Sequence, residues 1–295
     1  MESNRASRTA EYMAFYRAME SARPRTKRLF TDAFAIHFLR PSLRKAVVVC
    51  GIPYLGAVVA WYADRKAPGA RTSAIARTRL IDDTVSQALH EGIHQVVILG
   101  AGFDCRIYRL YGINSVVAFE VDHPATVAAK LSRLRGLGAK LPVNVRFVEI
   151  DFDRQSLAET LQRGGFDSGQ PAIFVWEGVT NYLTASAVDG VLRYVAGCAS
   201  GSRLVFTYVH RGVLDGSGGF PDAAKILSNV RELGEPWTFG LLPEELPSYL
   251  YERGLRLNRD DGASQYRRAY FGKAAESMNG YDFYHVAVAT VPLRI

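Results

Sequence analysis

Cysteine is scarce in this chain of 295 residues, and its placement excludes two common uses of the residue. The three cysteines, Cys50, Cys105 and Cys198, are odd in number, far apart and without a C-x-x-C pair. A disulfide framework or a zinc site would need paired or closely spaced cysteines. We therefore expect three reduced thiols in a cytoplasmic protein.

Histidine clusters, nucleic-acid motifs and a leader segment are also missing. The six histidines are scattered with no H-x-x-x-H pair, so no metal site is predicted. No basic run is interleaved with aromatic residues, which argues against nucleic acid as a partner. No apolar segment follows the polar residues 1–8, so a signal peptide is not expected.

Charge is absent from residues 46–63, a stretch of 18 residues that is long enough for a membrane-spanning helix. Gly51, Pro53 and Gly56 interrupt the stretch, and basic residues flank it on both sides. Proline breaks a helix and glycine weakens it, so one continuous helix over this stretch is disfavoured. Two short buried helices or a helical lid are predicted here, and no membrane span.

Positive charge is concentrated in the first quarter of the chain. Residues 1–79 contain 15 Lys and Arg against 5 Asp and Glu, a net charge of +10, whereas the remainder carries 21 against 24, a net charge of −3. A solvated arginine-rich surface would explain this asymmetry. Alternatively, a basic cap over the site would attract an anionic substrate.

The sequence Gln-Val-Val-Ile-Leu-Gly-Ala-Gly-Phe-Asp at residues 95–104 is the centre of the predicted fold. Its apolar residues predict a strand that is buried on both faces. The strand ends at Gly100 and Gly102, where the backbone must turn sharply. A second apolar run at 115–119 ends in Glu120-Val-Asp122. A strand, a glycine turn, a second strand and an acid are the pattern of a nucleoside-binding β-α-β unit.

Two features of this turn argue against a dinucleotide. Cys105 occupies the place of the third glycine of G-x-G-x-x-G, and Asp104 lies where the next helix should begin. A carboxylate there would repel a pyrophosphate at the helix N-terminus. Neither objection applies to S-adenosylmethionine, because this cofactor contains an adenosine but no phosphate. An NAD-dependent oxidoreductase is the alternative, but no Tyr-x-x-x-Lys pair follows this turn in the sequence.

The remaining pattern predicts one α/β domain over residues 1–295. A helical cap (1–92), with helices at 9–20, near 31–39 and at 74–90, precedes the core (93–295). Further strands are predicted at 145–150, 172–176, 203–210, 255–258 and 284–291, the last one antiparallel. A Gly- and Pro-rich insertion near 211–247 could close over a pocket.

Ligands of open α/β sheets bind beyond the carboxyl ends of the strands, where this chain has several candidate residues. Asp151 follows the third strand and could bond an adenine amino group, while Asp153 could cap the next helix, predicted at 155–161. Glu177 follows the fourth strand, and His210 ends the fifth.

These motifs together resemble the leucine carboxyl methyltransferase family, which includes bacterial O-methyltransferases of natural-product pathways. The resemblance spans about residues 5–210. It rests on the following motifs: Phe30-Thr-Asp-Ala, Ala76-Arg77-Thr-Arg79, Leu99-Gly-Ala-Gly-Phe-Asp104, Tyr108-Arg109-Leu110, Phe119-Glu-Val-Asp-His-Pro124, Asp151 and Trp176-Glu177-Gly-Val-Thr-Asn-Tyr182-Leu-Thr. Gly234-Glu-Pro-Trp237 and residues 281–290 are similar to the bacterial branch. The family implies a Rossmann-like class I methyltransferase with a mostly parallel seven-stranded sheet, an antiparallel last strand and an N-terminal helical cap.

The resemblance also implies roles for individual residues around S-adenosylmethionine. Residues that match family contacts to the methionine part are Arg77 and Arg17 for the carboxylate, Gly100, Ala101 and Gly102 for the turn beneath it, and Glu177 for the amino group. Residues that match contacts to the adenosine are Asp122, with Glu120 as its competitor, for the ribose, and Asp151 with Phe152 for the adenine. Tyr182 is implied to face the transfer site.

The acceptor is predicted to be a carboxylate on a small or medium-sized organic molecule. A carboxylate is ionised at neutral pH and needs no general base. A phenol or hydroxyl acceptor in a natural-product pathway is the alternative, with His210 as the base. His210 could equally be a strand-end histidine that bonds to a neighbour. A non-catalytic cofactor binder is disfavoured by the acids that remain at three strand ends, and the oligomeric state stays open.

Overall fold

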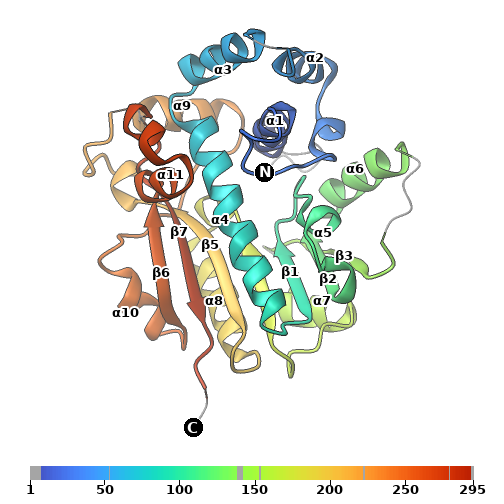
Figure 1. The fold of residues 1–295 in the computed structure, drawn as a ribbon. Coiled ribbons are helices and arrows are strands. Elements are labelled where there is room, and N and C mark those ends of the chain that lie inside the picture. The colour runs from blue at the N-terminus through green and yellow to red at the C-terminus, as the bar shows by residue number, and fades with distance from the viewer. Residues whose placement is uncertain are drawn as a thin grey trace.

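The computed structural model describes residues 8–52, 54–137, 142–152, 154–221, 223–278 and 280–293. Strand β1 (Gln95–Leu99) lies in the middle of a seven-stranded sheet with the order β3-β2-β1-β4-β5-β7-β6 (Figure 1). The other strands are β2 (Val117–Asp122), β3 (Val145–Glu149), β4 (Ala172–Trp176), β5 (Arg203–Val209), β6 (Arg256–Gly262) and β7 (Tyr284–Thr290). The first five strands are parallel, and β7 runs antiparallel to both of its neighbours, β5 and β6. The prediction of a mostly parallel sheet with an antiparallel last strand is confirmed.

Alternate residues of the central strands serve two hydrophobic layers. Val97 and Leu99 of β1 pack on the side covered by α7 (Leu157–Arg163), α8 (Ala185–Gly197) and α10 (Leu246–Tyr251). Val96 and Ile98 pack on the opposite side, against α4 (Ala70–His90), α5 (Arg106–Arg109) and α11 (Ala263–Phe271). Because both faces are covered, these strands read as continuous apolar runs.

A helical cap lies over the carboxyl ends of the parallel strands (Figure 1). It consists of α1 (Arg8–Ala22), the short helix η1 (Ala35–Phe38), α2 (Pro41–Cys50) and α3 (Leu55–Lys66). The helix predicted near 31–39 is reduced to η1. Asp32 explains this, because its carboxylate accepts the backbone N–H groups of Phe34 and Ala35 and so forms a local turn.

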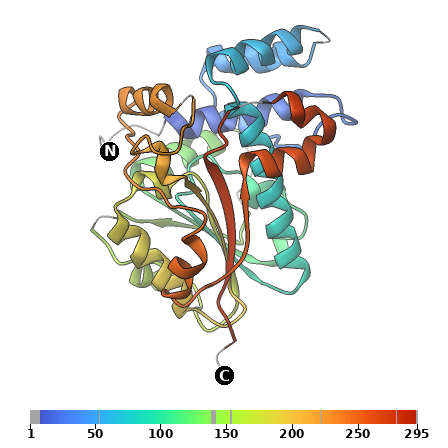
Figure 2. The same cartoon turned by 90° about the vertical axis from the view of Figure 1, so that its left-hand side faces the viewer.

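Of the two alternatives predicted for residues 46–63, two short buried helices or a helical lid, the first is half right. Two helices are present, but α3 has no buried residue, and α2 buries only Val47. Figure 2 shows the pair as the uppermost layer of the molecule. Nothing packs on their outer faces among the described residues, which is why their side chains stay exposed. No helix within the described ranges combines the length and apolar character that crossing a membrane requires.

The remaining elements are connections at the strand ends. They are η2 (Ile113–Ser115), α6 (Pro124–Arg135), η3 (Thr180–Tyr182), η4 (Arg211–Val213), α9 (Ala223–Glu232) and η5 (Gly272–Ser277). The helix predicted at 155–161 begins instead at Leu157, with Ser156 as its N-cap, because the Ser156 hydroxyl accepts the N–H of Glu159. Asp153, the predicted cap, lies outside the described residues.

Candidate active site

A cavity of about 1160 Å³ lies between the carboxyl ends of the strands and the helical cap. The carboxyl ends of strands β1, β2 and β4 form its floor, and helices α1, α3 and α9 contribute to its walls. Ten of the twelve predicted site residues line it, namely Arg17, Arg77, Gly100, Ala101, Gly102, Asp122, Asp151, Phe152, Glu177 and Tyr182. Glu120 and His210 do not belong to its lining.

The glycine turn after β1 requires glycine for two reasons. Gly100 has φ +65° and Gly102 has φ +45°, which side chains with a Cβ rarely adopt. A Cβ at Gly100 would also lie 2.4 Å from Cγ2 of Val179. The Gly100 and Ala101 N–H groups both donate to the Val121 carbonyl, at 2.8 and 3.1 Å. The turn is therefore tied to the end of β2, next to Asp122.

Asp122 stands at the last position of β2, where its carboxylate is held from two sides. It accepts the N–H of Gly102, and it accepts the N–H of His123 at 2.6 Å. Burial raises the pKa of Asp122, and these two donors oppose the rise. Each carboxylate oxygen keeps lone pairs for further donors, such as the hydroxyls of a ribose.

The structure does not bring Glu120 to the cavity, which corrects its prediction as a competing ribose contact. Its carboxylate lies 2.6 Å from Nζ of Lys130 on α6, and both side chains are 2% exposed. Burial raises the pKa of Glu120 to about 7, although Lys130 lowers it. Glu120 and Asp122 share one face of β2, but Glu120 lies two residues before the strand end, where α6 covers it.

Arg77 and Glu177 form an ion pair on the cavity wall. Nε of Arg77 donates to Oε1 of Glu177 at 2.8 Å, and the Arg77 guanidinium lies 4.5 Å from the ring centre of Tyr284. Nη2 of Arg106 lies 2.7 Å from the second oxygen of Glu177. Burial would raise the pKa of Glu177, but Arg106 and Arg77 lower it overall. Arg77 is only 4% exposed, whereas Arg79, two residues further along α4, pairs with Asp83 at 2.8 Å at the surface.

Arg106 and Arg109 connect this ion pair to a buried network of alternating charges. Asp82 accepts from Arg106 at 2.9 Å and from Arg109 at 2.7 Å. Arg109 also lies 3.7 Å from Asp32, which accepts from Arg17 at 2.9 Å. Buried charges are tolerated when each has partners of opposite sign. The network therefore holds Arg17 and Arg77 in place from behind the cavity.

The sequence analysis assigned no role to the residues that build this network. Asp32 and Arg109 stood in the motifs Phe30-Thr-Asp-Ala and Tyr108-Arg109-Leu110, so the motifs were the available signal. Asp82 was indistinguishable from the acids of a surface helix. Only the packing of α4 against α5 shows that its carboxylate is buried, with a residue exposure of 5%.

Tyr182 lines the cavity near two residues of the insertion. Burial raises its pKa to about 12, and side-chain hydrogen bonds to Trp237 and Thr9 oppose the rise. Thr9 of α1 also donates to the carboxylate of Glu235, which is 9% exposed and lines the same cavity. Glu235 therefore joins the insertion to the cap. The sequence analysis noted Glu235 and Trp237 only as part of a motif.

His210 is directed away from the cavity, which corrects its prediction as a general base. Its Nδ1 accepts the N–H of Gly212 at 3.0 Å and so caps η4. Its ring packs edge-on against Phe220 of the insertion at 5.2 Å, and burial lowers its pKa, with His285 adding to the effect. The alternative interpretation, a strand-end histidine bonded to a neighbour, describes it correctly.

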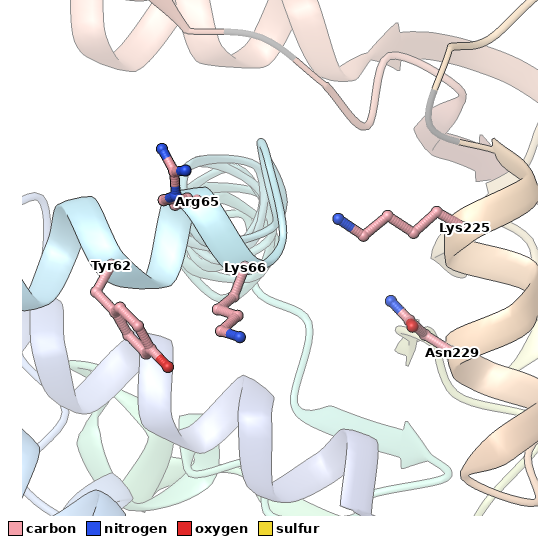
Figure 3. A pocket seen from close by; sticks show the side chains of 5 residues that line it. All are labelled: Tyr62, Arg65, Lys66, Lys225 and Asn229. Carbon is pink, nitrogen blue, oxygen red and sulfur yellow. The ribbon is translucent and has the colours of Figure 1, made fainter.

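The mouth of the cavity is basic. A hollow of about 570 Å³ between α3 and α9 is lined by Tyr62, Arg65, Lys66, Lys225 and Asn229, none of them acidic (Figure 3). All but Arg65 also line the main cavity. Figure 3 shows Lys66 and Lys225 on opposite sides of the opening. Within the part of the chain that the structure describes, no group of three or more His, Cys, Asp or Glu side chains could hold a metal ion.

Comparison with known proteins identifies relatives of this fold and site. The model of the leucine carboxyl methyltransferase family matches residues 10–196. A Mycolicibacterium gilvum protein, provisionally named an S-adenosyl-L-methionine-dependent methyltransferase, is 36% identical over 176 residues, which is 59% of this chain and 54% of that protein. A Mycobacterium tuberculosis protein with the same provisional name is 39% identical over 134 residues, 45% of this chain and 43% of that protein. The chain thus spans about half the length of the curated relatives it matches.

Two solved structures share the fold over almost the whole chain. A DUF574 family protein of Streptomyces avermitilis superposes with a TM-score of 0.58 and 16% identity, covering 97% of this chain and 98% of the other. A provisionally named methyltransferase of Thermobifida fusca superposes with a TM-score of 0.58 and 19% identity, covering 94% of each chain. These likenesses confirm the Rossmann-like methyltransferase fold.

Proposed function

Because this chain belongs to the leucine carboxyl methyltransferase family, we propose that it is an S-adenosylmethionine-dependent O-methyltransferase. We further propose that it esterifies a carboxylate of a small or medium-sized organic acceptor. The observation that carries the cofactor assignment is the convergence of three features on one cavity. These are the Gly100–Gly102 turn, the carboxylate of Asp122 and the Arg77–Glu177 ion pair.

The cavity lining fits the cofactor in its donor and acceptor chemistry. Asp122 would accept the ribose hydroxyls, and Asp151 with Phe152 would border the adenine. Arg77 and Arg17 would bind the methionine carboxylate, and Glu177 would bind its ammonium group. Charge-assisted hydrogen bonds of this kind are the strong ones. When bound, the cofactor supplies a methyl group on a cationic sulfur.

A dinucleotide fits the same turn less well. Asp104 lies two residues after Gly102 in the wall of the cavity, and Arg106 donates to its carboxylate. Burial would raise the pKa of Asp104, but Arg106 and Arg17 lower it to about 2. The carboxylate is therefore ionised at neutral pH and would repel a pyrophosphate. This supports S-adenosylmethionine over NAD.

In the transfer step the acceptor oxygen displaces sulfur at the methyl carbon, so that one O–C bond forms and the C–S bond breaks. The protein mainly has to orient the two reactants, which can contribute roughly 7–11 kcal/mol. Tyr182 and Trp237 line the cavity and would exclude water from the reacting atoms.

The carboxylate acceptor is supported by the charges that surround the cavity. Arg8, Lys66 and Lys225 line it, and none of them forms an ion pair with a described residue. They would attract an anion to the mouth. His210, the predicted base for a hydroxyl acceptor, lies outside the lining. A carboxylate acceptor has no need of such a base.

A hydroxyl acceptor is the second candidate, and Glu235 favours it. The buried carboxylate of Glu235 lines the cavity and could take the proton of a phenol or alcohol. The same negative charge would be unfavourable beside a carboxylate acceptor. We propose in either case a small-molecule substrate, one functional domain over 1–295 and a cytoplasmic role in secondary metabolism.

Two measurements test these proposals separately. Calorimetry with S-adenosylhomocysteine tests the cofactor, and tight binding of NAD in its place would refute the assignment. A panel of carboxylic acids and phenols with labelled S-adenosylmethionine tests the acceptor. Mild alkali cleaves a methyl ester and leaves an aryl methyl ether intact, so an alkali-stable product would favour the hydroxyl acceptor.

A further inference from the structure

Exposed hydrophobic side chains are concentrated on one part of the molecule. Seven of the eleven large hydrophobic residues that are exposed within the described ranges lie between positions 48 and 62. They are Val48, Ile52, Tyr54, Leu55, Val58, Trp61 and Tyr62, with exposures from 47% to 90%. A cluster of this kind on a soluble protein marks an interaction site more often than scattered single residues do. We call it the α2–α3 face.

The helical spacing of the α2–α3 face separates apolar residues from cations. Along α3, the exposed large apolar residues are Leu55, Val58, Trp61 and Tyr62, followed by Arg65 and Lys66 one turn later. Along α2, the exposed Arg44 and Lys45 come one turn before Val48. The exposed apolar residues therefore occupy the stretch from Val48 to Tyr62, with two cations before it in α2 and two after it in α3.

The charge on this face is positive and uncompensated. Arg44, Lys45, Arg65 and Lys66 form no ion pair with a described residue. Asp64 is the one acid between residues 41 and 66, and both of its oxygens already accept from Arg71, at 2.9 and 2.6 Å.

Trp61 and Tyr62 lie beside the cations at the end of α3. The Arg65 guanidinium lies 5.6 Å from the Trp61 ring centre, and the Lys66 ammonium lies 5.7 Å from that of Tyr62. Apolar anchors with aromatic rings and cations beside them are typical of helices that lie in a lipid–water interface.

We propose that the α2–α3 face docks on the surface of an anionic lipid bilayer. The apolar residues near the connection would enter the headgroup region, and the four cations would contact lipid phosphates. This inference goes beyond the proposed methyl transfer and does not depend on it. A second copy of the chain fits less well, because a two-fold contact would bring the uncompensated cations of both copies together with no acid to pair with.

The docking surface is continuous with the mouth of the cavity. Tyr62 belongs to the α2–α3 face, Lys66 lies one turn beyond it, and both line the hollow between α3 and α9 (Figure 3). An amphiphilic molecule at the bilayer surface would therefore meet the mouth without first crossing bulk water.

Vesicle binding by the purified full chain tests the proposal. The chain has three tryptophans: Trp176 is fully buried, Trp237 is half-buried, and Trp61 is 60% exposed. Vesicles of phosphatidylcholine with phosphatidylglycerol should sediment the protein and shift its tryptophan emission to shorter wavelength. Vesicles of phosphatidylcholine alone should bind it much more weakly, and added salt should release it. Trp61→Phe should still bind but lose the emission shift.

Variants separate the two parts of the face. Since one Lys or Arg near an anionic surface contributes about fivefold in affinity, Arg44→Gln with Lys45→Gln should weaken binding roughly 30-fold. Val58→Ser with Trp61→Ser should weaken it at least as much. Tyr111→Ser and Tyr251→Ser remove exposed aromatics elsewhere, at 98% and 80% exposure, and should bind as the parent does.

Three outcomes would overturn the proposal. The first is that the folded parent binds neither kind of vesicle. The second is that the emission shift persists in Trp61→Phe. The third is a dimer at micromolar concentration that Val58→Ser dissociates, which would assign the face to a second copy. Binding of S-adenosylhomocysteine by each variant reports whether its fold is intact. A variant that keeps this binding and loses vesicle binding is altered only at the docking surface.

Discussion

Arg77 and Glu177, which are a hundred residues apart in the sequence, are joined by a contact of 2.8 Å between Nε and Oε1 on the wall of the cavity. The pair connects α4 with the end of β4. Arg106 holds the other oxygen of Glu177, so that neither partner can turn away easily. Helix α4 and the sheet thus present one fixed pair of opposite charges to the cavity, which suits a zwitterionic ligand such as an amino acid.

The first prediction concerns this pair. Arg77→Ala should weaken the binding of S-adenosylhomocysteine by about 1.5–3 kcal/mol, because it removes a charge-assisted contact to the carboxylate. Isothermal titration calorimetry measures the change. Arg79→Ala is the matched control, since Arg79 lies two residues further on the same helix but is paired with Asp83 at the surface. Equal binding by both variants and the parent would remove Arg77 from the site.

The glycine turn gives the second prediction. Gly100→Ala should destabilise the fold more than Gly92→Ala does. Both glycines have positive φ, at +65° and +89°, so both variants incur backbone strain of about 1–2 kcal/mol. Only Gly100 has a neighbour, Val179, within 2.4 Å of the new Cβ, and overpacking costs typically about 1–3 kcal/mol more. Urea unfolding measures the difference, and equal losses would show that Val179 moves aside freely.

The third prediction is a pH dependence of stability that comes from Glu120. Its pKa is about 7 in the folded protein against an ordinary value of 4.5, because of its burial. Between these two values the folded state binds more protons than the unfolded state, so this contribution to stability should fall as the pH rises from 4.5 to 7. The fall should amount to at most about 3 kcal/mol. Urea unfolding at several pH values should show the fall in the parent and a flatter profile in Glu120→Gln. The idea fails if both profiles have the same slope.

The acceptor chemistry gives the fourth prediction. With a carboxylate acceptor, Glu235→Gln and His210→Gln should each keep kcat within a few-fold of the parent, and the rate should be nearly flat from pH 6 to 8. With a hydroxyl acceptor, Glu235→Gln should lose roughly 10²–10⁴-fold, because a general base contributes about that much. His210→Gln is the control for either case, since its ring caps η4 outside the cavity. A large loss in His210→Gln with an intact fold would contradict the placement of this residue.

Much of the fold follows from patterns that are local in the sequence. The apolar runs of β1 and β4 predict strands that are buried on both faces, and the structure confirms them to the residue at 172–176. Gly100 and Gly102 are recognisable because a sharp turn at a strand end needs positive φ. A parallel sheet then gathers the residues that follow its strands at one edge, so Asp122, Asp151 and Glu177 could be named as neighbours before any contact was known.

Tertiary packing decided what a local pattern leaves open. Glu120 and Asp122 point to the same face of β2, and only the position of α6 shows that one of them is covered by Lys130 while the other borders the cavity. The orientation of His210 depends on Phe220 in the insertion. The exposure of α2 and α3 depends on what packs on them. The sequence pattern of an uncharged stretch is the same whether the stretch is buried or faces outward, so the pattern does not predict this exposure. In each case the partner lies far away in the sequence, and periodicity carries no information about contacts of that kind.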